Sequence, residues 1–233
     1  MCKINIPVGV SDFEQIRKNE YYYVDKSGMI AEILSTESTL VTLITRPRRF
    51  GKTLGMSMLA SFFDIRKDSR NIFAGLEIAE NRELCDRWMN QYPVIFLSFK
   101  DVDGLTFTSA YEMLAATITD LYKEHLYLLG SDKINPYDQE IIRRLVEGKA
   151  SVTEVKRSLS LLITFMKMYY GKPVILLLDE YDVPVAKASD HGYYVQMLEI
   201  VKALMSTSLK DNPALKFAVL TGCLKIAKES IFT

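Results

Sequence analysis

The segment Thr39–Thr53 constrains the fold of this chain more than any other. It reads Thr-Leu-Val-Thr-Leu-Ile-Thr-Arg-Pro-Arg-Arg-Phe-Gly-Lys-Thr, an apolar β-branched run followed by a short loop that closes on Gly51-Lys52-Thr53. A buried strand, a tight turn and a helix N-terminus in this order are typical of a phosphate-binding loop. The general pattern G-x-x-x-x-G-K-[ST] would have its first glycine at position 46, where this sequence has Arg46. The segment therefore predicts a nucleotide-binding α/β protein with an irregular loop.

The bulk composition fits one α/β domain and excludes several classes of protein. With 233 residues and 48% hydrophobic content, the chain is large enough for one sizeable core. Basic and acidic residues both number 29, so the net charge of zero gives no support for a nucleic-acid-binding or membrane-surface protein. No apolar run is long enough to cross a bilayer. Scattered cysteines favour reduced thiols in a cytoplasmic protein, without a disulfide framework or zinc site: Cys2, Cys85 and Cys223.

Strand and helix patterns alternate along residues 39–233, which predicts a three-layer αβα fold with a mostly parallel sheet. Continuous apolar runs are typical of strands buried on both faces, and they cover Thr39–Thr45, Pro93–Phe99, Pro173–Leu178 and Leu215–Thr221. Helical periodicity covers Lys52–Phe63, Ser109–Leu129, Asp138–Glu147, Val152–Tyr170 and Tyr193–Leu209. In such a fold, ligands gather at the carboxyl ends of the strands.

Residues 1–38 are expected to form an N-terminal appendage of this core. Short helices are predicted over Ser11–Lys18 and Asp25–Leu34. The aromatic and β-branched run Tyr21–Val24 predicts a short strand between them.

The end of the loop supplies the chemistry that phosphate binding needs. Gly51 allows close backbone approach, Lys52 would reach the β- and γ-phosphates, and the Thr53 hydroxyl would bind Mg²⁺. The alternative is a surface turn that merely contains Gly-Lys-Thr.

A second motif makes that alternative weaker. The run Val174–Leu178 ends in Asp179-Glu180, the form of a Walker B strand with an acid at its end. Asp179 would hold Mg²⁺, and Glu180 would orient or deprotonate the attacking water. The alternative is a strand that ends in a polar turn, and Asp182 is predicted to be a solvated residue of that turn.

One strand separates the loop strand from the Asp-Glu strand in the sequence. This order, together with Glu180, resembles the additional-strand, catalytic-glutamate division of the P-loop NTPases, which contains the AAA+ proteins. The fourth strand then corresponds to the strand that ends in a polar sensor residue in that division. Thr221 ends this strand, and it is the candidate contact to the γ-phosphate or the attacking water. A threonine that simply ends a strand before a glycine turn is an equal alternative.

The loop is unusually rich in arginine. Pro47 removes one amide donor, and guanidinium groups could replace the missing backbone contacts because they bind phosphate bidentately. They could instead pair with acids, with a protein or with nucleic acid. Arg143 and Arg144 are expected to lie on a solvated helix face. The residues expected to contact nucleotide are Arg46, Arg48, Arg49, Phe50, Gly51, Lys52, Thr53 and Leu54.

Five motifs together carry a resemblance to a known family. They are Ile6-Pro-Val-Gly-Val-Ser-Asp-Phe13, Tyr22-Tyr-Val-Asp-Lys-Ser27, Arg46-Pro-Arg-Arg-Phe-Gly-Lys-Thr53, Leu177-Leu-Asp-Glu-Tyr-Asp182 and Leu220-Thr-Gly-Cys-Leu-Lys-Ile-Ala-Lys-Glu-Ser-Ile-Phe232. The chain resembles the AAA-ATPase-like domains of bacteria and archaea that precede a PD-(D/E)XK nuclease-like domain. The resemblance implies that Arg46 belongs to the family's own form of the loop, and that the N-terminal Tyr-Val-Asp-Lys segment packs near the nucleotide.

The same resemblance implies a boundary. Relatives continue into further ATPase sequence and then the nuclease-like domain, so residues 39–233 are expected to be a core truncated at its C-terminal end. No nuclease motif is found here, and nuclease activity is not assigned to these residues.

The leading hypothesis is an ATP-binding domain that hydrolyses ATP with Mg²⁺. The alternative is a nucleotide-dependent switch without hydrolysis, or a module that binds protein or nucleic acid. Expected partners are the nucleotide, a second copy of the chain in a homo-oligomer, and the nuclease-like domain of longer relatives; a membrane partner is not expected.

Overall fold

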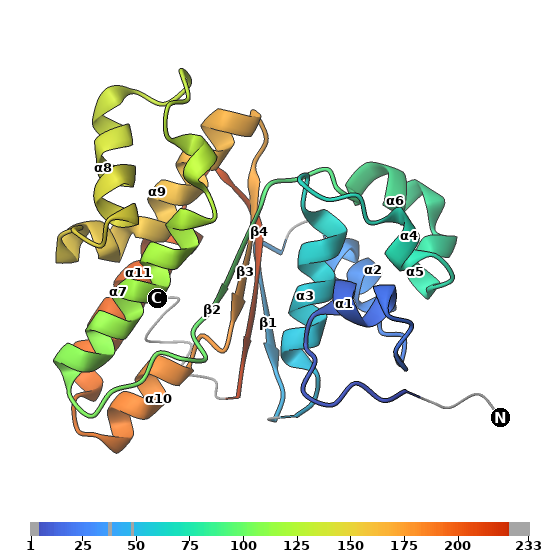
Figure 1. Ribbon diagram of the computed structural model, residues 1–233, viewed down its shortest axis with the longest axis horizontal. Coiled ribbons are helices and arrows are strands. Elements are labelled where there is room, and N and C mark those ends of the chain that lie inside the picture. The colour runs from blue at the N-terminus through green and yellow to red at the C-terminus, as the bar shows by residue number, and fades with distance from the viewer. Residues whose placement is uncertain (1–4, 37–38, 48, 224–233) are drawn as a thin grey trace.

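The protein is built around a four-stranded parallel sheet, shown by a computed structural model that describes residues 5–36, 39–47 and 49–223 (Figure 1). The spatial order of the strands is β1-β4-β3-β2, and all three pairings are parallel. The strands are β1 (Val41–Thr45), β2 (Val94–Ser98), β3 (Val174–Asp179) and β4 (Leu215–Gly222). The expected α/β class, parallel sheet and four strands are confirmed.

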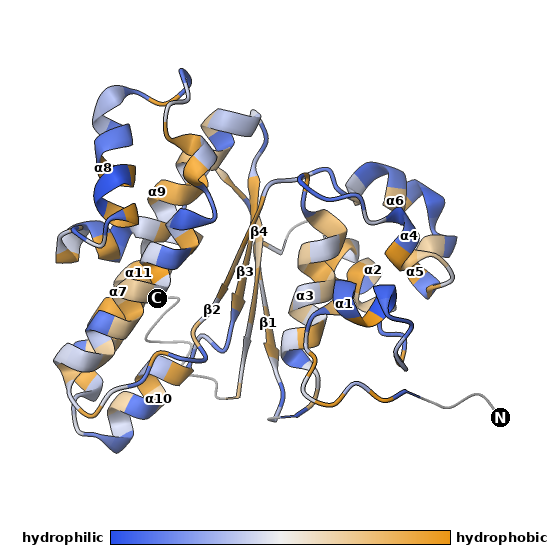
Figure 2. Ribbon diagram, in the orientation of Figure 1, coloured by the Kyte–Doolittle hydropathy of each residue, from blue (hydrophilic) through white to orange (hydrophobic). Residues whose placement is uncertain are grey.

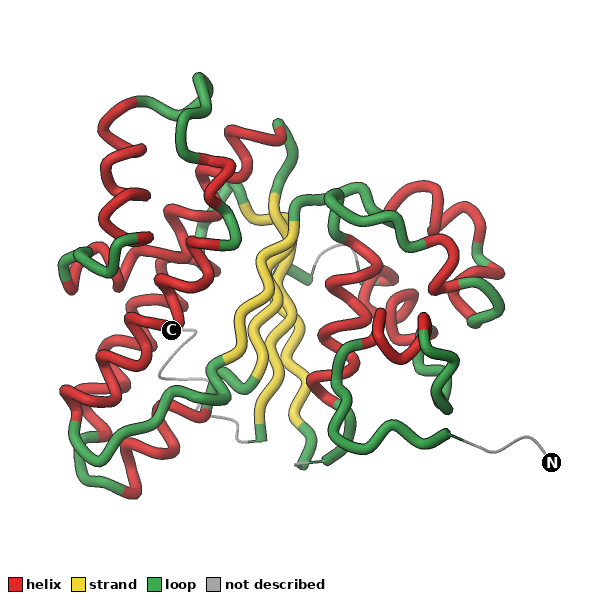
Figure 3. The backbone as a smooth tube through the Cα atoms, viewed as in Figure 1, coloured by secondary structure: helices red, strands yellow, loops and turns green. Residues whose placement is uncertain are grey.

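Helices cover both faces of the sheet (Figures 1 and 3). One layer contains α1 (Phe13–Lys18), α2 (Gly28–Ser35), α3 (Lys52–Phe63), α4 (Arg70–Phe73), α5 (Glu77–Glu80) and α6 (Arg82–Trp88). The other contains α7 (Phe107–Lys123), the 3₁₀ turn η1 (Leu126–Leu128), α8 (Pro136–Val146), α9 (Val152–Tyr170), α10 (Val183–Asp190) and α11 (Tyr194–Leu209). None of the helices within the described ranges is long and apolar enough to cross a membrane.

The apolar strands bury both of their faces, as their sequences require. In β3, Ile175 and Leu177 join the core on the α3 side, and Val174, Leu176 and Leu178 join the core on the α9 and α11 side. This alternation follows from the two-residue period of a strand. Figure 2 shows the hydrophobic colouring of the central strands and the mostly hydrophilic colouring of α8.

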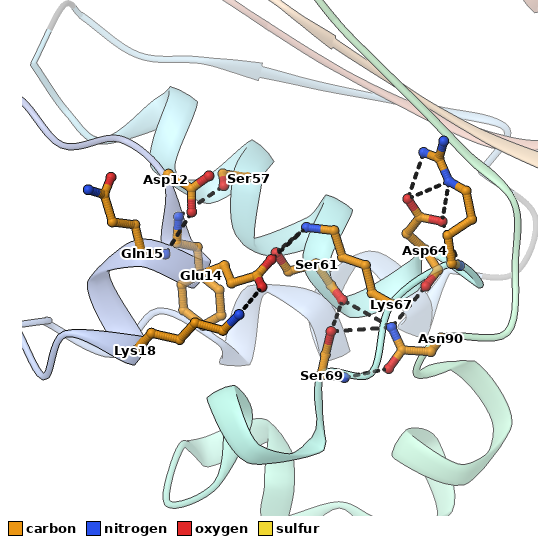
Figure 4. Close-up of polar contacts among 12 residues, drawn as sticks. Asp12, Glu14, Gln15, Lys18, Ser57, Ser61, Asp64, Lys67, Ser69 and Asn90 are labelled. Atoms are coloured by element: carbon orange, nitrogen blue, oxygen red, sulfur yellow. Dashed lines mark hydrogen bonds and ion pairs between the residues drawn. The ribbon is translucent and has the colours of Figure 1, made fainter. Parts of the chain in front are cut away.

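The N-terminal segment packs directly on α3 (Figure 4). The buried Phe13 donates its backbone N–H to Ser57 Oγ at 3.0 Å. Glu14 accepts from Lys18 at 2.6 Å and from Lys67 at 3.1 Å, so one carboxylate joins α1 to the segment after α3. These contacts fix α1 beside the helix that follows the candidate phosphate loop.

Two differences from the sequence expectations concern local structure. The predicted strand over Tyr21–Val24 is wrong: the structure has no strand at these residues, which pair with no sheet among residues 5–36, 39–47 and 49–223, and Tyr22 N–H donates to Asn5 O at 2.9 Å. The aromatic residues of the segment pack against the core instead: the Tyr23 and Phe13 rings meet edge-on, with their centroids 5.4 Å apart. The short helices α4–α6 and α10 were not predicted, because four- to eight-residue helices carry too few turns to show a period.

A buried histidine lies beyond the end of α7. His125 is 1% exposed, and its Nδ1 lies 2.8 Å from the Tyr127 hydroxyl. Burial disfavours the charged imidazolium and the neighbouring Arg66 repels it, so the pKa of His125 falls to about 3. The unfolded chain therefore binds a proton below about pH 6.5 that the folded chain does not bind.

We predict that the free energy of unfolding decreases as the pH falls below about 6.5, by up to about 1.4 kcal/mol per pH unit from His125 alone. Urea denaturation of the wild type and His125→Gln between pH 7 and pH 5 measures this. The variant should lose most of the pH dependence. His191→Gln, which replaces the second of the two histidines, should keep it, and equal slopes in all three proteins would contradict the prediction.

Candidate functional site

The loop between β1 and α3 lies at the carboxyl edge of the sheet, the lower edge in Figure 1. Gly51 is the N-cap of α3 and has a φ of 74°, a conformation that a side chain would strain. Arg49 also has a positive φ, of 69°. These two residues turn the chain sharply into the N-terminus of α3, where backbone N–H groups can bind an anion. Arg48 lies outside the described residues.

The Lys52 side chain folds back over its own loop. Its Nζ donates to the carbonyl oxygens of Arg46 at 2.9 Å and Pro47 at 3.2 Å, and it lies 3.3 Å from Cys223 Sγ. Carbonyl oxygens are neutral partners, so the ammonium charge is not cancelled by a carboxylate there. A phosphate oxygen is a stronger acceptor for this group.

Asp179 joins three elements at the same edge. Its side chain is 0% exposed, and its Oδ2 accepts from Thr53 Oγ1 at 2.8 Å. Its Oδ1 accepts from the hydroxyl of Thr221, and Ser98 Oγ lies 3.5 Å from Oδ2. The structure thus brings together three residues that the sequence separates by as much as 168 positions, from Thr53 to Thr221.

Glu180 contacts this group through its backbone. Its backbone has a φ of 52°, and its N–H points to Thr221 Oγ1 at 3.4 Å. A non-glycine residue in the left-handed region is uncommon and marks a constrained turn. Glu180 lines a cavity of about 240 Å³ together with Asp182, Lys187 and Cys223. The larger cavity beside Lys52 does not include it among its lining residues.

Asp182 corrects one sequence prediction. It was predicted to be a solvated turn residue, but it is only 3% exposed and its Oδ2 accepts the backbone N–H of Cys223 at 2.9 Å. A Cβ at Gly222 would lie 2.7 Å from Asp182 Oδ1 and 2.8 Å from Tyr181 Cε1. The glycine after Thr221 therefore permits the ends of β3 and β4 to pack closely, and it was the sequence signal for this contact.

A cavity of about 600 Å³ lies beside the loop. Its walls come from α2, β1 and the start of α3, and they include Arg46, Phe50, Gly51, Lys52 and Thr221 from the predicted set. Leu54 instead packs against the core on the α3 side. The cavity is also lined by Met29, Glu32 and Ile33 of α2 and by Thr36 after it, which were not expected. Lys26, just before α2, lines it too, and belongs to the Tyr-Val-Asp-Lys segment that the resemblance placed near the nucleotide.

Oxygen atoms suited to a magnesium ion are few in this region. Among the residues that the structure describes, no three His, Cys, Asp or Glu side chains gather as a ready-made metal site. Thr53 and Asp179 supply one hydroxyl and one carboxylate. Mg²⁺ commonly takes one or two protein ligands and completes its shell with water and substrate phosphates, so this pair fits the ion.

The remaining arginine expectation is confirmed. Arg143 and Arg144 lie on α8, in the helical layer that does not contain α3. Arg143 pairs with Glu140 at 2.6 Å and Arg144 pairs with Glu154, so both belong to a salt-bridged helix surface.

Comparisons with known proteins agree with this picture. A family model described as a predicted AAA-ATPase matches residues 7–232. A protein of Azotobacter chroococcum mcd 1, called "Uncharacterized protein in vnfD 5'region", is 27% identical over 235 residues. The match covers 100% of this chain and 40% of that relative, so the chain spans well under half of the relative's length. No solved structure matches the chain.

We predict that Thr221→Val lowers the free energy of unfolding by about 1–3 kcal/mol, because it leaves one oxygen of the buried Asp179 without its hydroxyl donor. Urea denaturation measures the loss. Thr42→Val is the matched control, since it makes the same change in β1 at a half-buried position and should stay within about 0.5 kcal/mol of wild type. Equal losses in the two variants would contradict the role given to Thr221.

Proposed function

The chain belongs to the predicted AAA-ATPase family, and from this premise we propose that it binds ATP with Mg²⁺ and hydrolyses it. The observation that carries the proposal is the meeting of Thr53, Asp179 and Thr221 beside Lys52, at the carboxyl edge of a parallel sheet. Parallel α/β sheets bind ligands at this edge. The adjacent cavity of about 600 Å³ has the size of a small-molecule site.

Each residue at the loop has a role in this proposal. The N–H groups at the start of α3 and the Lys52 ammonium bind the β- and γ-phosphate oxygens. Lys52 reaches them by exchanging the carbonyls of Arg46 and Pro47 for phosphate oxygens. Thr53 and Asp179 hold the magnesium ion, which neutralises charge on the phosphates.

The hydrolytic step needs a water molecule in line with the γ-phosphate. Glu180 acts as general base: it takes a proton from this water as the water oxygen bonds to the γ-phosphorus, the bond from that phosphorus to the β–γ bridging oxygen breaks, and ADP leaves. Thr221 orients the water or the γ-phosphate from the end of β4. The spatial order β1-β4-β3-β2 supports membership of the additional-strand, catalytic-glutamate division, because β4 lies between the loop strand and the strand that ends in Asp179.

The choice of ATP over GTP rests on the family. No guanine-reading Asn/Thr-Lys-x-Asp motif follows the strands. The exposed Phe50 lines the cavity together with Met29 and Ile33, and these side chains offer apolar surface for a base.

A nucleotide-dependent switch without hydrolysis is the second candidate function. The observation that favours it is the position of Glu180, which lines a different cavity from the one beside Lys52. In this alternative, nucleotide stabilises the fold and a partner surface. Tight binding of ATP with no phosphate release by the wild type, also at concentrations that produce oligomers, would select it.

We predict that wild-type protein binds Mg·ATP and releases phosphate, and that Lys52→Ala weakens binding by about 10- to 100-fold. This range corresponds to the loss of about 1.5–3 kcal/mol from a hydrogen bond to a charged group. Titration calorimetry with a non-hydrolysable analogue measures the affinity. Lys123→Ala, which removes a surface lysine paired with Asp120 on α7, should bind as wild type does.

We also predict that Glu180→Gln binds ATP normally and releases phosphate about 10²- to 10⁴-fold more slowly, the usual contribution of a general base. Steady-state phosphate release measures the rate. Glu147→Gln makes the same chemical change at the C-terminus of α8 and should not alter it. Hydrolysis at the wild-type rate in Glu180→Gln would exclude the role assigned to this carboxylate.

A further inference from the structure

Lys26 is a second lysine beside the phosphate loop, contributed from a distant part of the chain. It lines the same cavity as Lys52 and Arg46. Its Nζ is the nearest atom to the point where a Cβ on Gly51 would lie, at 3.8 Å. The ammonium group therefore lies close to the glycine that opens α3, and both residues line the cavity.

The segment around Lys26 is held firmly in place. Asp25 accepts the backbone N–H groups of Ser27 and Glu77, each at 2.8 Å, and the buried Ser27 accepts the N–H of Ile78 at 3.1 Å. Burial by itself would raise the pKa of Asp25, but these donors outweigh it and hold the pKa below its ordinary value. Asp25 therefore stays charged near neutral pH and ties the segment to the start of α5.

The close packing of Gly28 strengthens this attachment. A Cβ at Gly28 would lie 2.8 Å from both carboxylate oxygens of Glu77. The chain thus enters α2 against α5 with no room for a side chain on that surface. The residues on both sides of Lys26 are fixed, and its long side chain extends from a rigid base toward the loop.

Positive charge near the cavity is not neutralised within the described part of the protein. Lys26 and Arg46 make no ion pair with any residue that the structure describes, and Lys52 donates only to carbonyls and a thiol. Glu32 is the single acidic residue among those that line the cavity, and it is exposed. A multiply charged anion would supply the missing partner for these cations.

We propose that Lys26 binds a phosphate oxygen of the nucleotide directly, as a second lysine of the site, and that Asp25 is the positioning residue that holds it there. The inference rests on the proposed nucleotide site and adds a ligand from the N-terminal segment to it. A second lysine is needed because the loop has fewer backbone donors for phosphate: Arg46 replaces the usual glycine, and Pro47 lacks an N–H group. A cation from outside the loop replaces part of the lost backbone cradle.

The test compares Lys26→Gln, Lys26→Arg and Asp25→Asn with wild type by titration calorimetry. The two probes are a non-hydrolysable ATP analogue with Mg²⁺ and inorganic tripolyphosphate, which has the phosphates without the nucleoside. We expect Lys26→Gln to weaken both probes about tenfold, since a charge-assisted hydrogen bond is lost. Lys26→Arg should recover much of the affinity, because it keeps the charge.

Lys18→Gln is the matched control. It makes the same substitution in the same N-terminal segment, at an exposed lysine of α1 that pairs with Glu14 (Figure 4). It should bind both probes as wild type does. Asp25→Asn should weaken binding while thermal unfolding of the free protein remains cooperative, which separates positioning from loss of the fold.

The outcomes separate this inference from the proposed function. If Lys26→Gln and Lys18→Gln bind both probes equally well, Lys26 is not a phosphate ligand, whatever Lys52→Ala does. Suppose that the wild type binds tripolyphosphate but not the ATP analogue, and that Lys26→Gln no longer binds tripolyphosphate. This result would support Lys26 as an anion ligand and would contradict the proposed nucleotide function. If the wild type binds neither probe, both are overturned.

Discussion

The buried carboxylate of Asp179 is the constraint on which the rest of this site depends. A carboxylate removed from water is costly unless hydrogen bonds satisfy it. Here the hydroxyls of Thr53 and Thr221 do so, and they come from the first turn of α3 and the end of β4. The acid is stable only while β3, β4 and α3 keep their relative positions. The requirement to satisfy one buried carboxylate therefore links the ends of three elements around the candidate phosphate loop.

Two neighbouring features follow from the same packing. A side chain at Gly222 would collide with Tyr181 and Asp182, and Asp182 in turn accepts the N–H of Cys223. Cys223 then lies against Lys52. The chain after β4 is thus linked to the loop after β1, and the candidate phosphate lysine is in contact with the strand end that carries Thr221.

The sequence predicted the parts of this arrangement that depend on local patterns. Four apolar runs became the four strands, and Gly51-Lys52-Thr53 and Asp179 were identified because a strand end followed by these residue types has a distinct chemistry. Pairing between distant elements was harder to predict. Asp182 looked like a solvated turn residue because its burial depends on Gly222, 40 positions away. The resemblance placed the segment that contains Lys26 near the nucleotide, but no local pattern gave Lys26 itself a role, because its position near Gly51 depends on the attachment of Asp25 and Ser27 to α5. The false strand over Tyr21–Val24 arose because packing of Tyr23 on Phe13 favours the same residue types as a sheet.

We propose that Thr53, Asp179 and Lys52 together form the site for Mg²⁺ and the phosphates of ATP. A crystal structure with Mg²⁺ and a non-hydrolysable ATP analogue would test this site. We expect Lys52 Nζ to leave the carbonyls of Arg46 and Pro47 for the phosphates, and the metal to lie on Thr53 Oγ1 near Asp179. A nucleotide bound elsewhere, with Lys52 still on those two carbonyls, would contradict it.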